Sequence, residues 1–239
     1  MEYNTAYGYE QIDFPEKVCK EVFTKYLPLS MWDDIQLRRY TSVTEQGASM
    51  IRLIEPDYHC NAISLKFNML YMDYAIVDSL LSRGMVLLVP CASDKYKDWG
   101  IENYLRLAKE LKKRNREPLF ILGQQEKDLY CNAVEKAGFK AGVNLPLTAI
   151  AALAFSRQEE TIAIGNDTGV MHLIRACDCR SVTVCFEDTH LTWAPYPGER
   201  HCVIHADCAD YKTCMACGTH NCRKDFSFER VWNEVGNFI

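Results

Sequence analysis

From Met85 onwards, short apolar runs alternate with longer amphipathic stretches along the chain. The apolar runs have the length of buried strands, and the longer stretches repeat apolar residues at helical spacing. The expected strands are Met85–Pro90, Pro118–Leu122, Thr161–Gly165 and Ser181–Phe186. The expected helices are Asn103–Arg114, Gln125–Ala137, Leu147–Phe155 and Thr168–Ala176. Such a series of β–α units with short connections predicts an α/β fold, a parallel sheet with helices on both faces.

The two ends of the chain lack this alternation. Residues 1–84 contain a helix-like stretch at Asp73–Leu81 but no series of strand and helix units. Beyond the last expected strand lies a cysteine-rich segment, 202–222, and then an expected C-terminal helix at Ser227–Val235. We therefore divide the chain into a short N-terminal region and an α/β domain, residues 85–239.

Composition narrows the class of protein. With 48% hydrophobic and 25% charged residues, the 239-residue chain has enough apolar material for a core. Its net charge of −5 gives no electrostatic argument for nucleic-acid binding. The first residues lack the basic start and apolar stretch of a signal peptide, and no apolar run reaches the roughly 18 residues of a membrane span. These features favour a cytoplasmic protein.

Three polar turns follow expected strands, at Pro90–Trp99, Gly123–Glu126 and Gly165–His172. In an open α/β sheet, ligands bind outside the carboxyl ends of the strands, so position alone makes these turns candidates. The first turn combines small residues such as Ser93, which let a ligand approach the backbone, with lysines that suit phosphate. Considered alone, this turn is explained more simply as a solvent-exposed loop with surface lysines.

The other two turns each allow two interpretations. Glu126 is suited to accept hydrogen bonds from ribose hydroxyls, or to stabilise the start of a helix as an acid in its first turn. The Asn166–Gly169 turn leads from a strand into a helix, so its free backbone N–H groups form an anion site. Alternatively, Asp167 or Thr168 simply caps that helix. His172 either supports a ligand site or is a hydrogen-bonded core histidine.

The order of these motifs resembles glycosyltransferase family 9, enzymes similar to the ADP-heptose:lipopolysaccharide heptosyltransferases. The similar stretches cover most of residues 85–195. They are a small-residue turn with Lys-x-Trp at 92–99, Gly-x-x-Glu at 123–126, Asn-Asp-Thr-Gly-x-Met-His at 166–172, and Phe-x-x-Thr with Trp and Pro at 186–195. The resemblance implies a GT-B architecture, in which two Rossmann-like halves face each other across a cleft. This chain would contain the C-terminal, donor-binding half.

The resemblance also implies a ligand and a set of donor-binding residues. The ligand is a nucleotide-diphospho-sugar, such as ADP-heptose, used to make lipopolysaccharide or another glycan in the cytoplasm or peripherally at the inner membrane. Lys97 would contact the phosphates, Glu126 the ribose, and Asp167, with its neighbours, the sugar-diphosphate end. The implied donor-binding residues are Ser93, Lys97, Glu126, Asp167, Thr168, Gly169, His172 and Thr189. No cofactor is implied for catalysis.

The chain departs from the family pattern in places that concern catalysis. Its first turn reads Val89-Pro90-Cys91 where the family has His-Pro-Gly. Residues 1–84 are fewer than the roughly 150 of a Rossmann-like half, and they lack the Gly-Asp turn that carries the family's general base. We therefore assign no catalytic residue and expect this chain alone to transfer sugar poorly. The alternative is a non-catalytic sugar-nucleotide-binding or assembly module, whose acceptor half is degenerate or supplied by a second chain.

The chain contains twelve cysteines. Because thiols in the cytoplasm stay reduced, we interpret their spacing in terms of a metal site and not of disulfides. The spacing of four of them suits one tetrahedral ion, a structural zinc or iron. These four are Cys208, Cys214, Cys217 and Cys222. A reduced cysteine-rich loop without metal is the alternative, and of the two interpretations it is the one we favour. Three others, Cys177, Cys179 and Cys185, fall in or near core elements and are interpreted as small buried hydrophobes.

Overall fold

The computed structural model describes five stretches of the chain. All of them belong to a compact unit that runs from Ala62 to Ile239, one of the two units into which the chain divides. The described residues are 71–92, 97–156, 160–186, 200–205 and 226–239.

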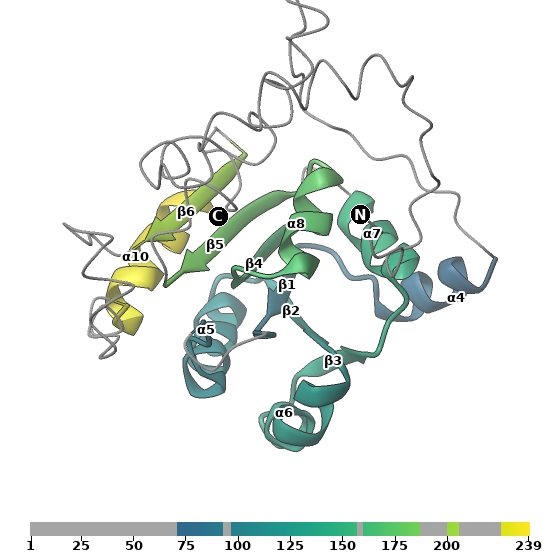
Figure 1. Cartoon of the computed structure of the whole chain (residues 1–239), viewed down its shortest axis with the longest axis horizontal. Coiled ribbons are helices and arrows are strands. Elements are labelled where there is room, and N and C mark those ends of the chain that lie inside the picture. Colours follow the sequence, from purple (N-terminus) through teal and green to yellow (C-terminus); the bar gives the residue numbers. More distant parts are fainter. Residues whose placement is uncertain (1–70, 93–96, 157–159, 187–199, 206–225) are drawn as a thin grey trace, which may run out of the picture. The chain divides into compact units, whose positions relative to one another are not determined.

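A six-stranded sheet forms the centre of this unit (Figure 1), and every pair of neighbouring strands in it is parallel. In spatial order the strands are β3-β2-β1-β4-β5-β6, an arrangement shared by dinucleotide-binding Rossmann folds. In chain order they are β1 (Met85–Val89), β2 (Glu117–Leu122), β3 (Lys140–Val143), β4 (Ile162–Asn166), β5 (Arg180–Cys185) and β6 (His201–His205).

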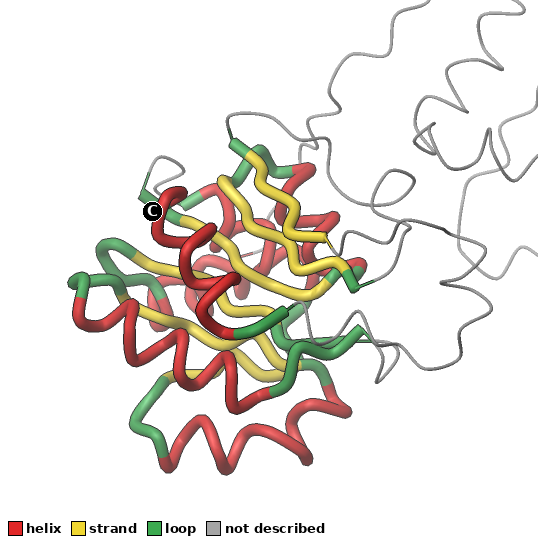
Figure 2. Tube along the Cα trace, turned by 90° about the vertical axis from the view of Figure 1, so that its left-hand side faces the viewer, coloured by secondary structure: helices red, strands yellow, loops and turns green. Residues whose placement is uncertain are grey.

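Helices cover both faces of the sheet (Figure 2). In chain order they are α4 (Tyr71–Leu80), α5 (Ile101–Lys113), α6 (Gln124–Lys136), α7 (Leu147–Phe155), α8 (Gly169–Ala176) and α10 (Phe228–Phe238). The buried side chains of α5, α6 and α10 share one apolar cluster, and those of α4, α7 and α8 share the other. The predicted α/β fold with helices on both faces is confirmed.

Alternation along the strands explains why there are two clusters. Leu87 of β1 belongs to the cluster of α7 and α8, whereas its neighbour Leu88 belongs to the cluster of α5. Successive side chains of a strand point to opposite faces, so a strand covered on both sides must be apolar throughout. All five residues of β1 are buried, as that rule requires. The central strand therefore reads as a continuous apolar run.

Two strands escaped the sequence prediction, β3 and β6, and both lie at the ends of the sheet. In β3 only Gly142 is buried, and in β6 only Ile204. An end strand has one neighbour and is less covered, so its sequence need not be apolar. The four central strands were predicted correctly to within one residue at each end.

The helix α4 lies in the stretch that we grouped with the N-terminal region. Its Val77 is 5% exposed and packs in the cluster that contains α7. The carbonyl of the same residue accepts a 2.7 Å hydrogen bond from the backbone N–H of Leu81. Thus α4 is part of the packing that covers one face of the sheet.

The chain reverses its direction of winding between β1 and β4. The helix α5, which follows β1, packs on one face, and α8, which follows β4, packs on the other. Because β1 and β4 are hydrogen-bonded neighbours, their carboxyl ends flank the point at which a crevice opens in such sheets. Gly165 allows β4 to pack closely against β1 and α8 at this point, because a Cβ there would lie 2.7 Å from Cβ of Val89 and 2.8 Å from Sδ of Met171.

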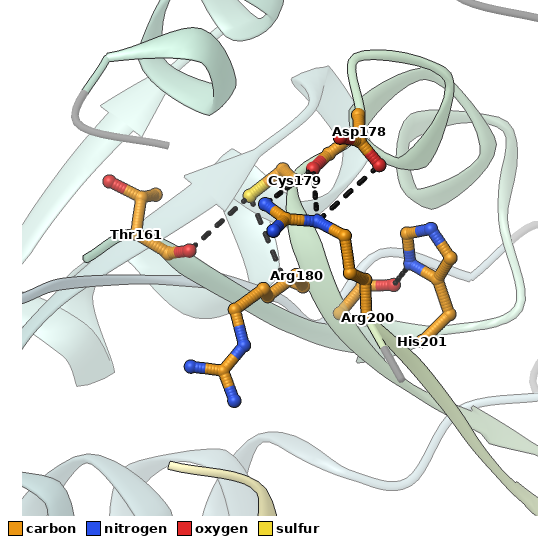
Figure 3. A network of polar contacts seen from close by, with 7 residues as sticks. Thr161, Asp178, Cys179, Arg180, Arg200 and His201 are labelled. Atoms are coloured by element: carbon orange, nitrogen blue, oxygen red, sulfur yellow. Dashed lines mark hydrogen bonds and ion pairs between the residues drawn. The ribbon is translucent and has the colours of Figure 1, made fainter. Parts of the chain in front are cut away.

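A polar network lies at the opposite, amino-terminal ends of the strands (Figure 3). Arg200 donates from Nε and Nη2 to the carbonyl of Asp178, at 3.2 and 3.1 Å. Oγ of Ser181 lies 3.0 Å from Nδ1 of His201. Burial, and then the charge of Arg175, lower the pKa of His201 from 6.5 to about 4. His201 is therefore neutral in the folded protein at any pH near 7.

This histidine should make the protein less stable in mild acid. Between pH 6.5 and about 4 the unfolded chain binds a proton that folded His201 refuses, so stability falls as pH drops through this window. After discounting for the partly exposed ring, we expect a loss of about 1–2 kcal/mol. Urea unfolding at pH 7 and pH 4.5 measures it, with His201→Asn as the control. An equal loss in the parent and the variant would contradict the prediction.

Candidate functional site

The described residues of the three polar turns lie at one edge of the sheet, because β1, β2 and β4 are neighbours whose carboxyl ends lie together. Contacts between described residues join them. Asn166, at the end of β4, is hydrogen-bonded to Cys91 and Trp99, which lie near the two ends of the first turn. Cys91, in turn, lies beside the carboxylate of Glu126 in the second turn. The sequence interpretation of three converging turns is therefore consistent with the structure.

The third turn contains two buried oxygen atoms that make no hydrogen bond to a described residue. Oδ1 of Asp167 and Oγ1 of Thr168 are buried, and neither has a hydrogen-bond partner within the stretches that the structure describes. Thr168 is the N-cap residue of α8 by position, but its side chain makes no capping bond. Buried polar atoms in native proteins are usually satisfied, so atoms left over at a strand end point to a ligand.

Asp167 has an ionisable neighbour on the next helical turn. Nε2 of His172 lies 3.4 Å from Oδ1 of Asp167, and the His172 side chain is 36% exposed. The thiol of Cys185 donates to the other carboxylate oxygen of Asp167 over 3.9 Å. His172 is therefore a partly exposed neighbour of the carboxylate and not a fully buried core histidine.

Glu126 lies in the first turn of α6, whose N-cap is Gly123. Its carboxylate folds back over that glycine, since a Cβ on Gly123 would lie 2.8 Å from Oε2 of Glu126. This position lets the carboxylate stabilise the N-terminus of the helix and still face the edge of the sheet. Both interpretations of Glu126 therefore fit the same geometry.

Cys91 fills the space between the ends of β1 and β2. Its thiol donates to the carbonyl of Ile121 over 3.3 Å. Burial, reinforced by the charge of Glu126, raises the pKa of the Cys91 thiol from 9.0 to about 11. Because a nucleophilic cysteine must be a thiolate, Cys91 is a neutral packing and hydrogen-bonding group here.

The end of the first turn is held by Asp98, the residue after Lys97. Oδ1 of Asp98 accepts from the backbone N–H of Gly100 at 2.8 Å, and Oδ2 accepts from the hydroxyl of Tyr130 at 2.8 Å. Burial, and then hydrogen bonding to Asp98, raise the pKa of Tyr130, so its hydroxyl stays a donor. Asp98 thus connects the start of α5 with α6 and fixes the backbone next to half-buried Lys97.

Two residues of this region were not singled out from the sequence as functional. Trp99 is 4% exposed, and its indole N–H donates to the carbonyl of Phe226 at 2.9 Å. Asn166 is fully buried and makes hydrogen bonds with both of its amide atoms. The available signal was the asparagine itself, a polar residue that ends the apolar strand Ile-Ala-Ile-Gly.

Several predicted site residues lie outside the described stretches. They are Ser93 and Thr189 from the donor set and Cys208, Cys214, Cys217 and Cys222 from the metal set. The structural zinc or iron therefore stays a prediction. Within the described stretches, no three His, Cys, Asp or Glu side chains are grouped to hold a metal ion. The core cysteines Cys177, Cys179 and Cys185 are buried, as predicted.

The amino-acid sequence also matches the model of a known protein family. The model of glycosyltransferase family 9 (heptosyltransferase) matches residues 32–221. The chain belongs to glycosyltransferase family 9. A search of curated protein sequences found none that matches this chain.

Solved structures of family 9 proteins share the fold of this chain. One is a family 9 glycosyltransferase from Veillonella parvula, with a TM-score of 0.68 at 15% identity over 84% of this chain and 60% of that one. Another is the ADP-heptose lipopolysaccharide heptosyltransferase II of E. coli, with a TM-score of 0.58 at 18% identity over 73% and 53%. A third is the E. coli heptosyltransferase WaaC with ADP, with a TM-score of 0.53 at 16% identity over 70% and 49%.

The identities and coverages limit what can be concluded from the similarity to these structures. At such low identities it establishes the fold, which is that of the GT-B glycosyltransferases. The family 9 chain spans about half to three fifths of the length of these structures. Separately, none of the helices in the described stretches is both long and apolar enough to cross a membrane.

Proposed function

We propose that this family 9 chain binds a nucleotide-diphospho-sugar, with ADP-heptose or a similar ADP-sugar as donor, for sugar transfer in glycan synthesis. The observation that carries the proposal is the pair of buried oxygens on Asp167 and Thr168, beside the start of α8, that accept no hydrogen bond from a described residue. A sugar hydroxyl is a donor that satisfies such acceptors. Two of the fold's neighbours support the choice of nucleotide, one described as an ADP-heptose transferase and one solved with ADP.

The start of α8 supports the placement of the diphosphate. Gly169 is exposed, and apart from its chain neighbours and the backbone of its own helix no described atom lies within 4 Å of where its Cβ would be, so a ligand can approach the backbone there. Backbone N–H groups and the helix dipole at this terminus favour an anion. Lys97 adds a positive charge from the neighbouring turn. These groups would stabilise the pyrophosphate as the acceptor oxygen attacks the anomeric carbon and the nucleoside diphosphate leaves.

The remaining residues are proposed to bind the two ends of the donor. Glu126 accepts hydrogen bonds from the ribose hydroxyls, and Asp167 accepts from the sugar, with His172 holding its carboxylate in place. Lipopolysaccharide is the acceptor class that the E. coli neighbour suggests. The transfer also needs a general base to take the proton of the acceptor hydroxyl, and we assign that role to no described residue.

Gly169→Ala tests the anion site without disturbing the fold. An alanine fits the start of a helix and meets no described atom, so stability should stay equal or rise by up to about 1 kcal/mol. The added methyl group obstructs the backbone N–H groups, and ADP affinity should fall about tenfold, or 1.4 kcal/mol. Calorimetric titration with ADP and ADP-heptose measures this affinity.

The matched control is Gly236→Ala, in α10. Its Cβ would make an ordinary 3.6 Å contact with Arg114, away from the three polar turns, so ADP affinity should not change. Parent-like affinity in Gly169→Ala would remove the start of α8 from the site. Transfer to an acceptor is measured separately from binding, because the alternative of a non-catalytic sugar-nucleotide-binding module predicts binding alone.

A further inference from the structure

The side-chain amide of Asn166 uses all of its hydrogen-bonding capacity inside the protein. Its Nδ2 donates to the carbonyls of Pro90 and Cys91, at 3.0 and 3.3 Å. Its Oδ1 accepts from the backbone N–H of Trp99 at 3.3 Å and from the hydroxyl of Tyr104 at 2.8 Å. The two carbonyls can only accept and the Trp99 N–H can only donate, so these partners fix the orientation of the amide.

The four partners belong to parts of the chain that are far from Asn166 in sequence. Pro90 and Cys91 follow β1, Trp99 precedes α5, and Tyr104 lies in the first turns of α5. Asn166 itself is the last residue of β4, and Asp167 and Thr168 follow it directly. One buried side chain therefore holds together the two strand ends between which the sheet reverses its winding.

We propose that Asn166 is the positioning residue of the donor site, locking the segment that carries Lys97 against the segment that carries Asp167 and Thr168. This inference rests on the proposed function, because the two segments need a fixed distance only if one ligand spans them. Asn166 acts through the backbone of these segments and need not touch the donor.

Neither of the residues closest in shape to asparagine can replace it. Aspartate keeps the acceptor for Trp99 and Tyr104 but points a second oxygen at the Pro90 and Cys91 carbonyls. Leucine leaves all four partner groups buried without a bond. The aspartate variant regains a donor when it is protonated, and burial against two carbonyls favours that neutral form. Its defect should therefore be reversed by acid, whereas that of leucine should not.

The experiment measures ADP binding by calorimetry in the full chain, at several pH values. For Asn166→Leu we expect affinity at least about tenfold below the parent at every pH, as a displaced phosphate contact would cause. For Asn166→Asp we expect a similar loss at pH 8 and recovery to within about threefold of the parent at pH 5.5. All ratios are taken against the parent at the same pH, since ADP itself titrates.

Two controls separate positioning from general destabilisation. Leu111→Ala removes a fully buried side chain near the far end of α5, so it should lower stability without changing ADP affinity. Tyr104→Phe removes one of the two bonds to Oδ1 and leaves both bonds from Nδ2, so affinity should fall no more than about threefold. Unchanged ADP affinity in Asn166→Leu would overturn the proposal.

Amide hydrogen exchange at Trp99 gives a second readout that needs no ligand. The Trp99 N–H loses its acceptor in Asn166→Leu and keeps it in Asn166→Asp, so exchange should be faster in the leucine variant alone. If the parent does not bind ADP, the proposed function fails, and exchange at Trp99 still decides whether Asn166 joins the two segments. Equal exchange in the parent and Asn166→Leu would refute that joining role.

Discussion

Replacing Trp99 with alanine should lower the free energy of unfolding by about 3–5 kcal/mol, the range for large aromatic residues in a core. The indole is almost fully buried, 5.1 Å from the ring of Tyr104 in a T-shaped pair and 6.1 Å from the stacked ring of Phe228. Its loss leaves a cavity and an unpaired carbonyl at Phe226. Urea unfolding followed by circular dichroism measures the change.

Two substitutions serve as comparisons for Trp99→Ala. Trp99→Phe keeps an aromatic ring but removes the N–H donor to Phe226, and it should cost roughly 1–3 kcal/mol. Trp232→Ala removes a tryptophan that is only partly buried in α10 and should cost less than Trp99→Ala. If Trp99→Ala proved as mild as Trp232→Ala, Trp99 would not anchor the start of α5 to α10.

Lys97→Ala should weaken the binding of ADP by about 1.5–3 kcal/mol, or 10- to 150-fold, if the ammonium contacts a phosphate directly. The side chain is half-buried next to Asp98, whose carboxylate fixes the backbone at the start of α5. Removing the charge deletes a charge-assisted bond while leaving the fold intact. Calorimetry with ADP at low and moderate salt measures the loss.

The control for this variant is Lys113→Ala at the other end of α5. Lys113 is 69% exposed and pairs with Glu110 at 2.7 Å, so its removal should leave ADP affinity unchanged. Added salt should weaken binding more in the parent than in Lys97→Ala, because screening acts on the charge that the variant lacks. Equal affinities of Lys97→Ala and the parent would remove Lys97 from the site.

The sequence allowed the central fold to be predicted because periodicity survives wherever burial is complete. The α5 helix shows an apolar face through Leu107 and Leu111, both fully buried, and its range was predicted to within two residues at each end. At β3 and β6 the burial is partial, and the apolar signal disappears with it.

Site prediction from sequence was limited for a different reason. Charged and small residues after strands, such as Lys97 and Asp167, are visible as a pattern because they interrupt apolar runs. The role of Asn166 depends on partners 62 to 76 residues away in the chain, and no local pattern contains that information. Likewise, only the structure shows that the Thr168 hydroxyl forms no cap and so remains available.

The order of the strands delays the completion of the sheet while the chain is being synthesised. Val86 of the central strand pairs with Pro118 on one side and with Ile162 on the other. At roughly 5–20 residues per second, the ribosome needs several seconds to extend the chain from the first of these partners to the second. Throughout that interval one edge of an entirely apolar strand has no native partner, which is the condition under which nascent chains aggregate or engage chaperones.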